Sequence, residues 1–133
     1  MSAPADRYEA ARRWLRFASE DLHSAGTLLE HEDAPRLVCW AAEKAVKAAL
    51  TLCGVRFPKT HDIDELMGLL PAGGCLRPGA ADTAWLSQWA PASRYPGDWP
   101  EGDSADAQRA IEEASKVLKA AELDLSAGGA GLA

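Results

Sequence analysis

The segment ADRYEAARRWLRFASEDLHSAGTLLEH (residues 5–31) decides the fold class of this chain. Its apolar residues recur at alternating steps of three and four, which is the period of one face of an α-helix. The members of this stripe are Tyr8, Ala11, Leu15, Ala18, Leu22, Ala25 and Leu29. Charged side chains fill the opposite face, so we expect one long amphipathic helix over residues 5–31.

The rest of the chain predicts further helices and no strand. Pro35 favours a helix start and Gly54 a helix end, because proline fits the first turn and glycine readily takes the left-handed conformation past the last. Asp62 is expected to cap a third helix, with Glu65 completing a capping box. A fourth short helix is expected over about residues 80–90, and a last one from Asp103 or Ser104 to Ser126.

These elements predict an all-α protein, an up-and-down bundle of four to five helices. At 133 residues the chain fits a single domain. We expect this domain over residues 1–126, followed by a disordered tail over residues 127–133, which is rich in alanine and glycine.

Composition narrows the function classes. The net charge of −6 argues against non-specific binding to duplex nucleic acid, although a local basic patch is compatible with it. No signal peptide and no apolar run long enough to span a membrane can be read, so a cytoplasmic location is expected. Cys39, Cys53 and Cys75 are odd in number and form no CxxC pair, which predicts no disulfide framework and no structural zinc site. No HExxH motif, carboxylate–histidine cluster or Gly-rich phosphate loop can be read, so no metal site and no cofactor are expected.

One candidate site lies on the second helix, where Trp40, Glu43, Lys44 and Lys47 are spaced three and four apart and share a face opposite the alanine stripe. One interpretation is a solvated face with a Glu43–Lys47 pair worth a few tenths of a kcal/mol. The other is a contact surface for a nucleotide, in which the lysines attract phosphate.

A second candidate is His61, in the loop before the third helix. It either helps to cap that helix or acts as a general acid or base, since histidine titrates nearest to neutral pH. Arg56 precedes it with four residues between them, an arginine–x4–histidine spacing that also suits a catalytic pair.

A third candidate is the loop SRYPGDW (residues 93–99). Arg94 can donate a planar pair of hydrogen bonds to phosphate, and Tyr95 offers a face on which a base can stack. The alternative is a loop fastened to the bundle by its aromatic side chains.

Together these segments resemble the HEPN domain family over about residues 7–122. The resemblance rests on four stretches, which are WLRFASEDLHSA (14–25), AEKAVKA (42–48), GVRFPKTHDIDEL (54–66) and ASRYP (92–96). It implies a helical bundle that commonly dimerises and associates with nucleotides or RNA. It also implies a neighbouring minimal nucleotidyltransferase, as a partner or as the other half of a toxin–antitoxin pair.

The chain departs from the pattern that the resemblance implies for nucleases. Such members cut RNA without metal, with an arginine and a histidine near the start of the last long helix, and a polar residue follows the arginine. Here Phe57 follows Arg56, the last helix has no histidine, and Ile63 stands where some toxins carry a tyrosine.

Three functions therefore compete. The leading one is a nucleotide- or RNA-associated subunit that works with a nucleotidyltransferase, with Glu43, Lys44, Lys47, Arg94 and Tyr95 as its binding residues. The second is a metal-independent endoribonuclease that uses His61 with Arg56 or Arg94. The third is a structural partner without a ligand. A homodimer is expected in each case.

Overall fold

The structure is a computed structural model that describes residues 4–27, 34–70, 83–89 and 104–131. Within these residues the chain forms five helices and no strand, and the predicted all-α class is confirmed. The helices are α1 (Pro4–Gly26), α2 (Ala34–Leu52), α3 (Ile63–Met67), α4 (Thr83–Ser87) and α5 (Ser104–Gly131). None of them combines the length and apolar character needed to cross a membrane.

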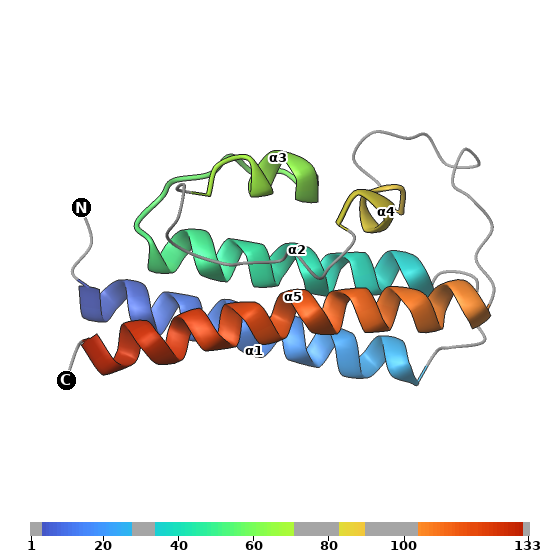
Figure 1. Cartoon of the computed structure of the whole chain (residues 1–133), viewed down its shortest axis with the longest axis horizontal. Helices are drawn as coiled ribbons and strands as arrows, with labels where there is room; N and C mark the ends of the chain where they lie inside the picture. The colour runs from blue at the N-terminus through green and yellow to red at the C-terminus, as the bar shows by residue number, and fades with distance from the viewer. Residues whose placement is uncertain (1–3, 28–33, 71–82, 90–103, 132–133) are drawn as a thin grey trace.

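Three long helices form the body of the molecule, and α1, α2 and α5 all pack against one another (Figure 1). α2 runs antiparallel to α1, while α5 runs in the same direction as α2. The short helices α3 and α4 lie along α2 and take the place of one long antiparallel helix. They bring the chain back to the end of the bundle where α2 begins, and α5 starts there. The predicted up-and-down arrangement therefore holds, with two short helices standing for one long one.

α2 is the central helix, since it packs against all four others. Its small side chains allow this close approach: Ala42, Ala45 and Ala49 are fully buried, and Val46 and Leu50 fill the space between the neighbouring helices. A helix that is covered on nearly every side differs from the amphipathic pattern expected from the sequence. Between residues 38 and 50, the part of α2 whose burial is described before its last two residues, Trp40 and Lys44 reach the solvent and the others are buried.

Gly54 ends α2 as predicted. Its φ of 75° lies in the left-handed region, which favours glycine. The amide of Gly54 donates to the carbonyl of Thr51 at 3.0 Å, and that of Val55 donates to Leu50 at 2.9 Å. These two bonds are those of a Schellman motif, and they turn the chain towards the segment that carries His61.

Two helix boundaries differ from the prediction. α1 ends at Gly26, whereas the sequence predicted residue 31, and residues 28–31 lie outside the described residues. α5 continues to Gly131, five residues beyond the expected end at Ser126. Each residue added to an existing helix gains one hydrogen bond for the conformational freedom of one residue. A long helix can therefore extend into a segment whose residues have a low helix propensity.

The cysteines correct one expectation. Cys53, just after α2, is disulfide-bonded, although the sequence predicted no disulfide framework. Spacing along the chain does not decide this, because a disulfide requires only that two Cα atoms come within about 7 Å in space. Cys39 is a free thiol, buried in α2.

Cys39 is predicted to be chemically inert in the folded protein. Burial raises the pKa of its thiol from 9.0 to about 12, and the nearby carboxylates of Glu43, Asp62 and Asp64 act in the same direction. At pH 8 only about one thiol in ten thousand is then ionised, and the thiolate is the reactive form. Alkylation followed by mass spectrometry of the Cys39 peptide should show modification in urea and almost none in the native protein.

The raised pKa also fixes the sign of a pH effect. The unfolded state loses the Cys39 proton near pH 9 and the folded state only near pH 12, so the contribution to stability is complete below pH 9 and is lost as the pH rises towards 12. A Cys39→Ala variant should lose less stability over this range. An equal fall in the free energy of unfolding between pH 9 and pH 12 in the wild type and in Cys39→Ala would contradict the raised pKa of Cys39.

Candidate functional site

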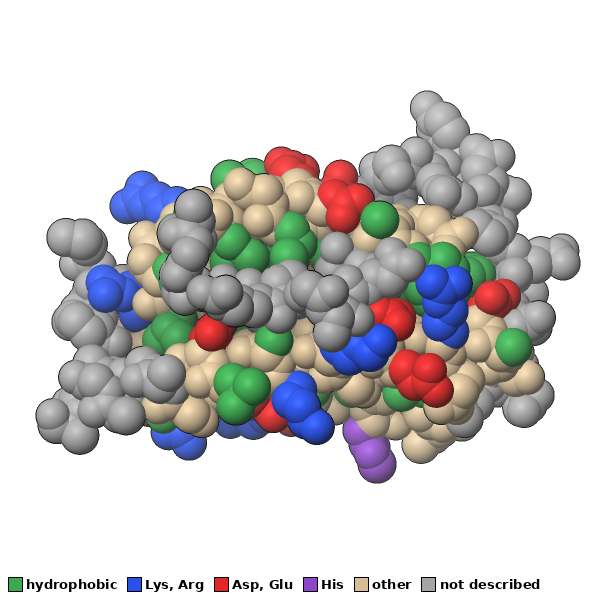
Figure 2. Space-filling model, viewed as in Figure 1, with side chains coloured by type: hydrophobic (Ala, Val, Ile, Leu, Met, Phe, Trp, Pro, Cys, Tyr) green, Lys and Arg blue, Asp and Glu red, His purple; other side chains and the backbone are tan. Residues whose placement is uncertain are grey.

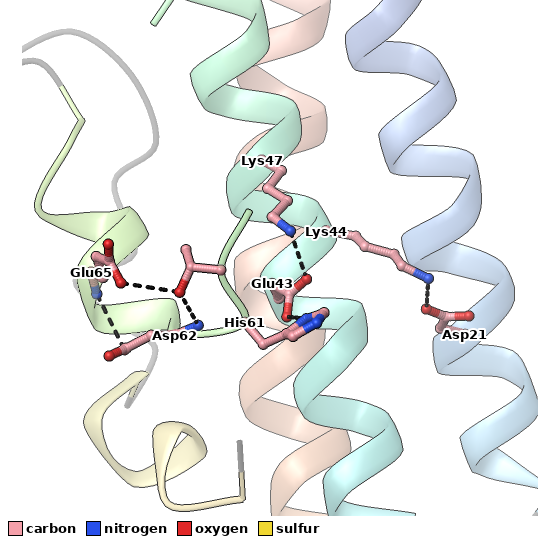
Figure 3. Close-up of polar contacts among 8 residues, drawn as sticks. Asp21, Glu43, Lys44, Lys47, His61, Asp62 and Glu65 are labelled. Atoms are coloured by element: carbon pink, nitrogen blue, oxygen red, sulfur yellow. Dashed lines mark hydrogen bonds and ion pairs between the residues drawn. The ribbon is translucent and has the colours of Figure 1, made fainter. Parts of the chain in front are cut away.

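A buried carboxylate lies at the centre of the candidate site. Glu43 is 3% exposed, and both of its oxygens have partners. Oε2 accepts a hydrogen bond from Lys47 Nζ at 2.9 Å, and Oε1 lies 2.9 Å from His61 Nδ1 (Figure 3). The interpretation of a solvated face is therefore wrong for Glu43 and Lys47, because the turn that carries His61 covers this side of α2.

Lys47 is a buried cation. Its residue is 7% exposed, and its ammonium lies 5.5 Å from the ring centroid of Trp14 and 5.8 Å from that of Phe57. The two rings contact each other at a centroid distance of 6.2 Å with a tilt of 60°. Cation–π contacts strengthen where water is excluded, so the rings and the Glu43 carboxylate together stabilise a charge that would otherwise be costly to bury.

A network of short hydrogen bonds holds the turn that carries His61. The Thr60 hydroxyl donates to Glu65 Oε2 at 3.0 Å and accepts from the Asp62 amide at 3.1 Å. Asp62 Oδ1 accepts from the amides of Asp64 and Glu65 at 3.0 and 3.2 Å. Asp62 is thus the predicted N-cap of α3, and the predicted capping box is changed, because the Glu65 side chain bonds Thr60 instead of the Asp62 amide.

His61 itself is oriented and accessible. A carboxylate oxygen only accepts hydrogen bonds, so Nδ1 carries the proton in the bond to Glu43. The His61 side chain remains 58% exposed. The ring therefore has one nitrogen committed to the buried carboxylate, and Nε2 has no hydrogen-bond partner within the described part of the chain. In the neutral ring Nε2 can accept a proton, and in the imidazolium it can donate a hydrogen bond to an anion.

Lys44 lies beside this cluster and does not join it. Its Nζ lies 2.5 Å from Asp21 Oδ2 on α1, and Figure 3 shows the side chain reaching across to that helix, away from Glu43. Both side chains of this pair are about one third exposed. Lys44 is therefore closer to solvent than Lys47, but it is already paired.

The other predicted site residues divide into two groups. Arg56 is exposed and forms no hydrogen bond or ion pair with His61, although both residues are described. Arg94 and Tyr95 lie outside the described residues, and their binding role stays a prediction. Among the described candidates, the structure brings Lys47 and His61 together, because both bond Glu43.

The sequence interpretation did not assign a site role to Trp14, Asp21, Phe57 or Thr60. Trp14 and Phe57 surround the Lys47 ammonium, Asp21 pairs with Lys44, and Thr60 fixes the His61 turn. A signal for them was present, because all four lie within the stretches that carry the family resemblance. Their partners are distant in sequence, so spacing alone did not connect them.

Comparison with known proteins agrees with this picture. The model of the HEPN domain family matches residues 11–124, and the chain belongs to that family. No curated protein and no solved structure matches the chain significantly. Trp14, Glu43, Lys47, Phe57 and His61 all fall within the matched range.

The two lysine pairs are predicted to differ in their contribution to stability. Lys47→Met keeps an unbranched apolar side chain but leaves the buried Glu43 carboxylate without its cation, which should cost about 3 kcal/mol or more. Lys44→Met removes a partly exposed pair and should cost about 1 kcal/mol or less. Urea denaturation of both variants measures the difference. Equal losses would show that the Glu43–Lys47 pair is not buried in solution.

Proposed function

We propose that this chain is a nucleotide- or RNA-associated HEPN subunit that works beside a small nucleotidyltransferase, in one form as half of a toxin–antitoxin pair. The observation that supports the proposal most is the exposed His61 ring held at Nδ1 by the buried Glu43 carboxylate. A surface histidine without such a partner can rotate freely. An oriented one is suited to recognising a ligand.

In the proposed contact His61 is in its imidazolium form, so that Nδ1–H donates to Glu43 and Nε2–H donates to a phosphate oxygen. Bonds between a charged donor and an anion are shorter and about twice as strong as neutral ones. Glu43 and Lys47 act as positioning residues, since both are buried and each is bonded within the cluster. They support His61 from behind and do not themselves contact the ligand.

Electrostatics favour a local contact over a broad one. The chain has a net charge of −6, and in the face shown in Figure 2 lysine and arginine side chains are interspersed with aspartate and glutamate. Phosphate must therefore be held by a few placed groups. In the proposal, Arg94 and Tyr95 add the second phosphate contact and a stacking surface, as expected from the sequence.

An endoribonuclease is the second candidate, and the same histidine supports it. A ring whose Nδ1–H is fixed by a carboxylate presents Nε2 as a base for a 2′-hydroxyl proton. An arginine would then stabilise the charge that develops on the phosphorus oxygens. Arg56 forms no hydrogen bond or ion pair with His61, so in this candidate either Arg56 moves to the site when RNA binds or Arg94 supplies the positive charge.

We also propose that the subunit forms a homodimer. Trp40, on α2, is 36% exposed and Leu69, just after α3, is 37% exposed, so both offer apolar surface that a second copy could cover. Burial of such side chains against a second copy would complete an alanine-rich core that contributes little apolar area per residue.

Replacing His61 is predicted to weaken ligand binding. His61→Ala should reduce the affinity for ATP, GTP and a short RNA by about tenfold or more, the effect of one lost hydrogen bond to a charged group. His23→Ala is the matched control, because His23 is an exposed histidine on α1. Titrations at low and physiological salt measure both variants and Arg94→Ala.

The outcomes separate the three functions. If His61→Ala and Arg94→Ala bind nucleotide or RNA more weakly while His23→Ala binds as the wild type does, the result supports the binding subunit. Cleavage of RNA by the wild type in EDTA, abolished in His61→Ala, would replace it by the endoribonuclease. An absence of binding and cleavage by the wild type would overturn both and leave the structural partner.

A further inference from the structure

A second surface, on α1, has the composition of a ligand site. The stretch RRWLRF (residues 12–17) carries three arginines and two aromatic residues and no acidic residue, in a chain whose net charge is −6. Leu15 is buried in the core, whereas Arg12, Arg13, Arg16 and Phe17 are exposed. Basic and aromatic side chains interleaved on one surface are typical of nucleic-acid binding.

The aromatic residues line a small pocket. Its walls are Ala10, Arg13, Trp14 and Phe17, and its volume is about 190 Å³. Sites for drug-sized ligands usually measure about 300–1,000 Å³. This pocket is smaller and is therefore suited to a single planar ring system, with the Arg13 guanidinium at its edge.

The pocket is preorganised on one side. Trp14 contacts Phe57 and the Lys47 ammonium, and these contacts restrict the rotation of the indole. On the other side Phe17 has the Arg16 guanidinium 5.4 Å from its ring centroid. A ring entering the pocket would meet aromatic surfaces that need little ordering, which lowers the entropic cost of binding.

The arginines beside the pocket can bind an anion. Arg13 forms no hydrogen bond or ion pair within the described part of the chain, and Arg12 has an exposed 3.4 Å contact with Glu9 and lies 5.8 Å from the ring centroid of Tyr8. Both arginines, with Arg16, also line a hollow of about 640 Å³ between α1 and α5, and Glu122 on α5 lines it as well. Glu9 and Glu20 lie about one helical turn before and after the arginines, so the basic surface is long enough for only one or two phosphates.

From these observations we propose that this face of α1 binds single-stranded nucleic acid. One base stacks in the pocket between Trp14 and Phe17, and the adjoining phosphate contacts Arg13 and Arg16. The site goes beyond the proposed role of His61, since none of these four residues contacts that histidine. An acidic peptide would match the arginines but would leave the two aromatic surfaces unused, and for that reason we favour a polynucleotide.

Fluorescence anisotropy with a labelled oligouridine RNA tests the stacking contact, with an abasic strand of the same length for comparison. Phe17→Ala should weaken RNA binding about fivefold or more, the effect of one lost stacking contact, and leave abasic binding unchanged. Leu123→Ala is the matched control, because it also removes an exposed apolar side chain.

The phosphate contact has its own variants. Arg13→Ala should weaken the binding of both strands and reduce the slope of log affinity against log salt by roughly 0.7, the value for one phosphate on a single strand. Arg13→Lys should restore most of the affinity. Lys116→Ala removes one exposed charge elsewhere, on α5, and should change neither quantity. All of these titrations are made in a His61→Ala background, which removes the proposed contact of that histidine, so an effect of Phe17→Ala or Arg13→Ala reports on the α1 face alone and separates it from the proposed function.

Three results would overturn the proposal. Equal affinity of the protein for RNA and for the abasic strand would show that it binds the phosphates alone and that no base stacks in the pocket. Complete displacement of RNA by polyglutamate at matched charge would indicate an acidic protein segment as the ligand. A fall from dimer to monomer mass in light scattering of Phe17→Ala would show that a second copy covers this face.

Discussion

Glu43 brings a carboxylate into the interior of a small helical protein, and the polar contacts of the site follow from the need to satisfy its two oxygens. A buried carboxylate without partners would cost several kcal/mol. Here one oxygen is bonded to Lys47, one turn along α2, and the other to His61, which arrives from the turn before α3. The same contact that satisfies Glu43 therefore fixes an exposed histidine over the central helix.

Lys47 extends this dependence to α1. Its ammonium is stabilised by Glu43 on one side and by the rings of Trp14 and Phe57 on the other. Trp14 in turn lines the small pocket on the α1 surface. One buried cation thus lies between the histidine site and the basic, aromatic face of α1, so both surfaces depend on the packing of α1 against α2.

The sequence predicted the helices well because their signals are local. The apolar period of α1, the cap at Asp62 and the stop at Gly54 each depend on residues within a few positions of one another. The sequence did not predict that Glu43 and Lys47 are buried. Their face of α2 looked solvated because the residues that cover it, Phe57 and His61, come from the segment after the helix.

The sequence named His61, Glu43 and Lys47 as candidate site residues from their spacing and chemistry, and the structure brings these three side chains together. Glu43 and Lys47 are buried, whereas the His61 side chain is exposed. The disulfide at Cys53 was not predicted, since it depends on closeness in space.

Nitrogen-15 NMR of the His61 ring tests the central claim most directly, because it reports which nitrogen carries the proton when the ring is neutral. A bond to the Glu43 carboxylate requires the proton on Nδ1, and Glu43→Ala should return His61 to a mixture dominated by the Nε2–H form. Wild-type protein with the proton on Nε2, unchanged in Glu43→Ala, would contradict the account, since Glu43 would then not hold the histidine.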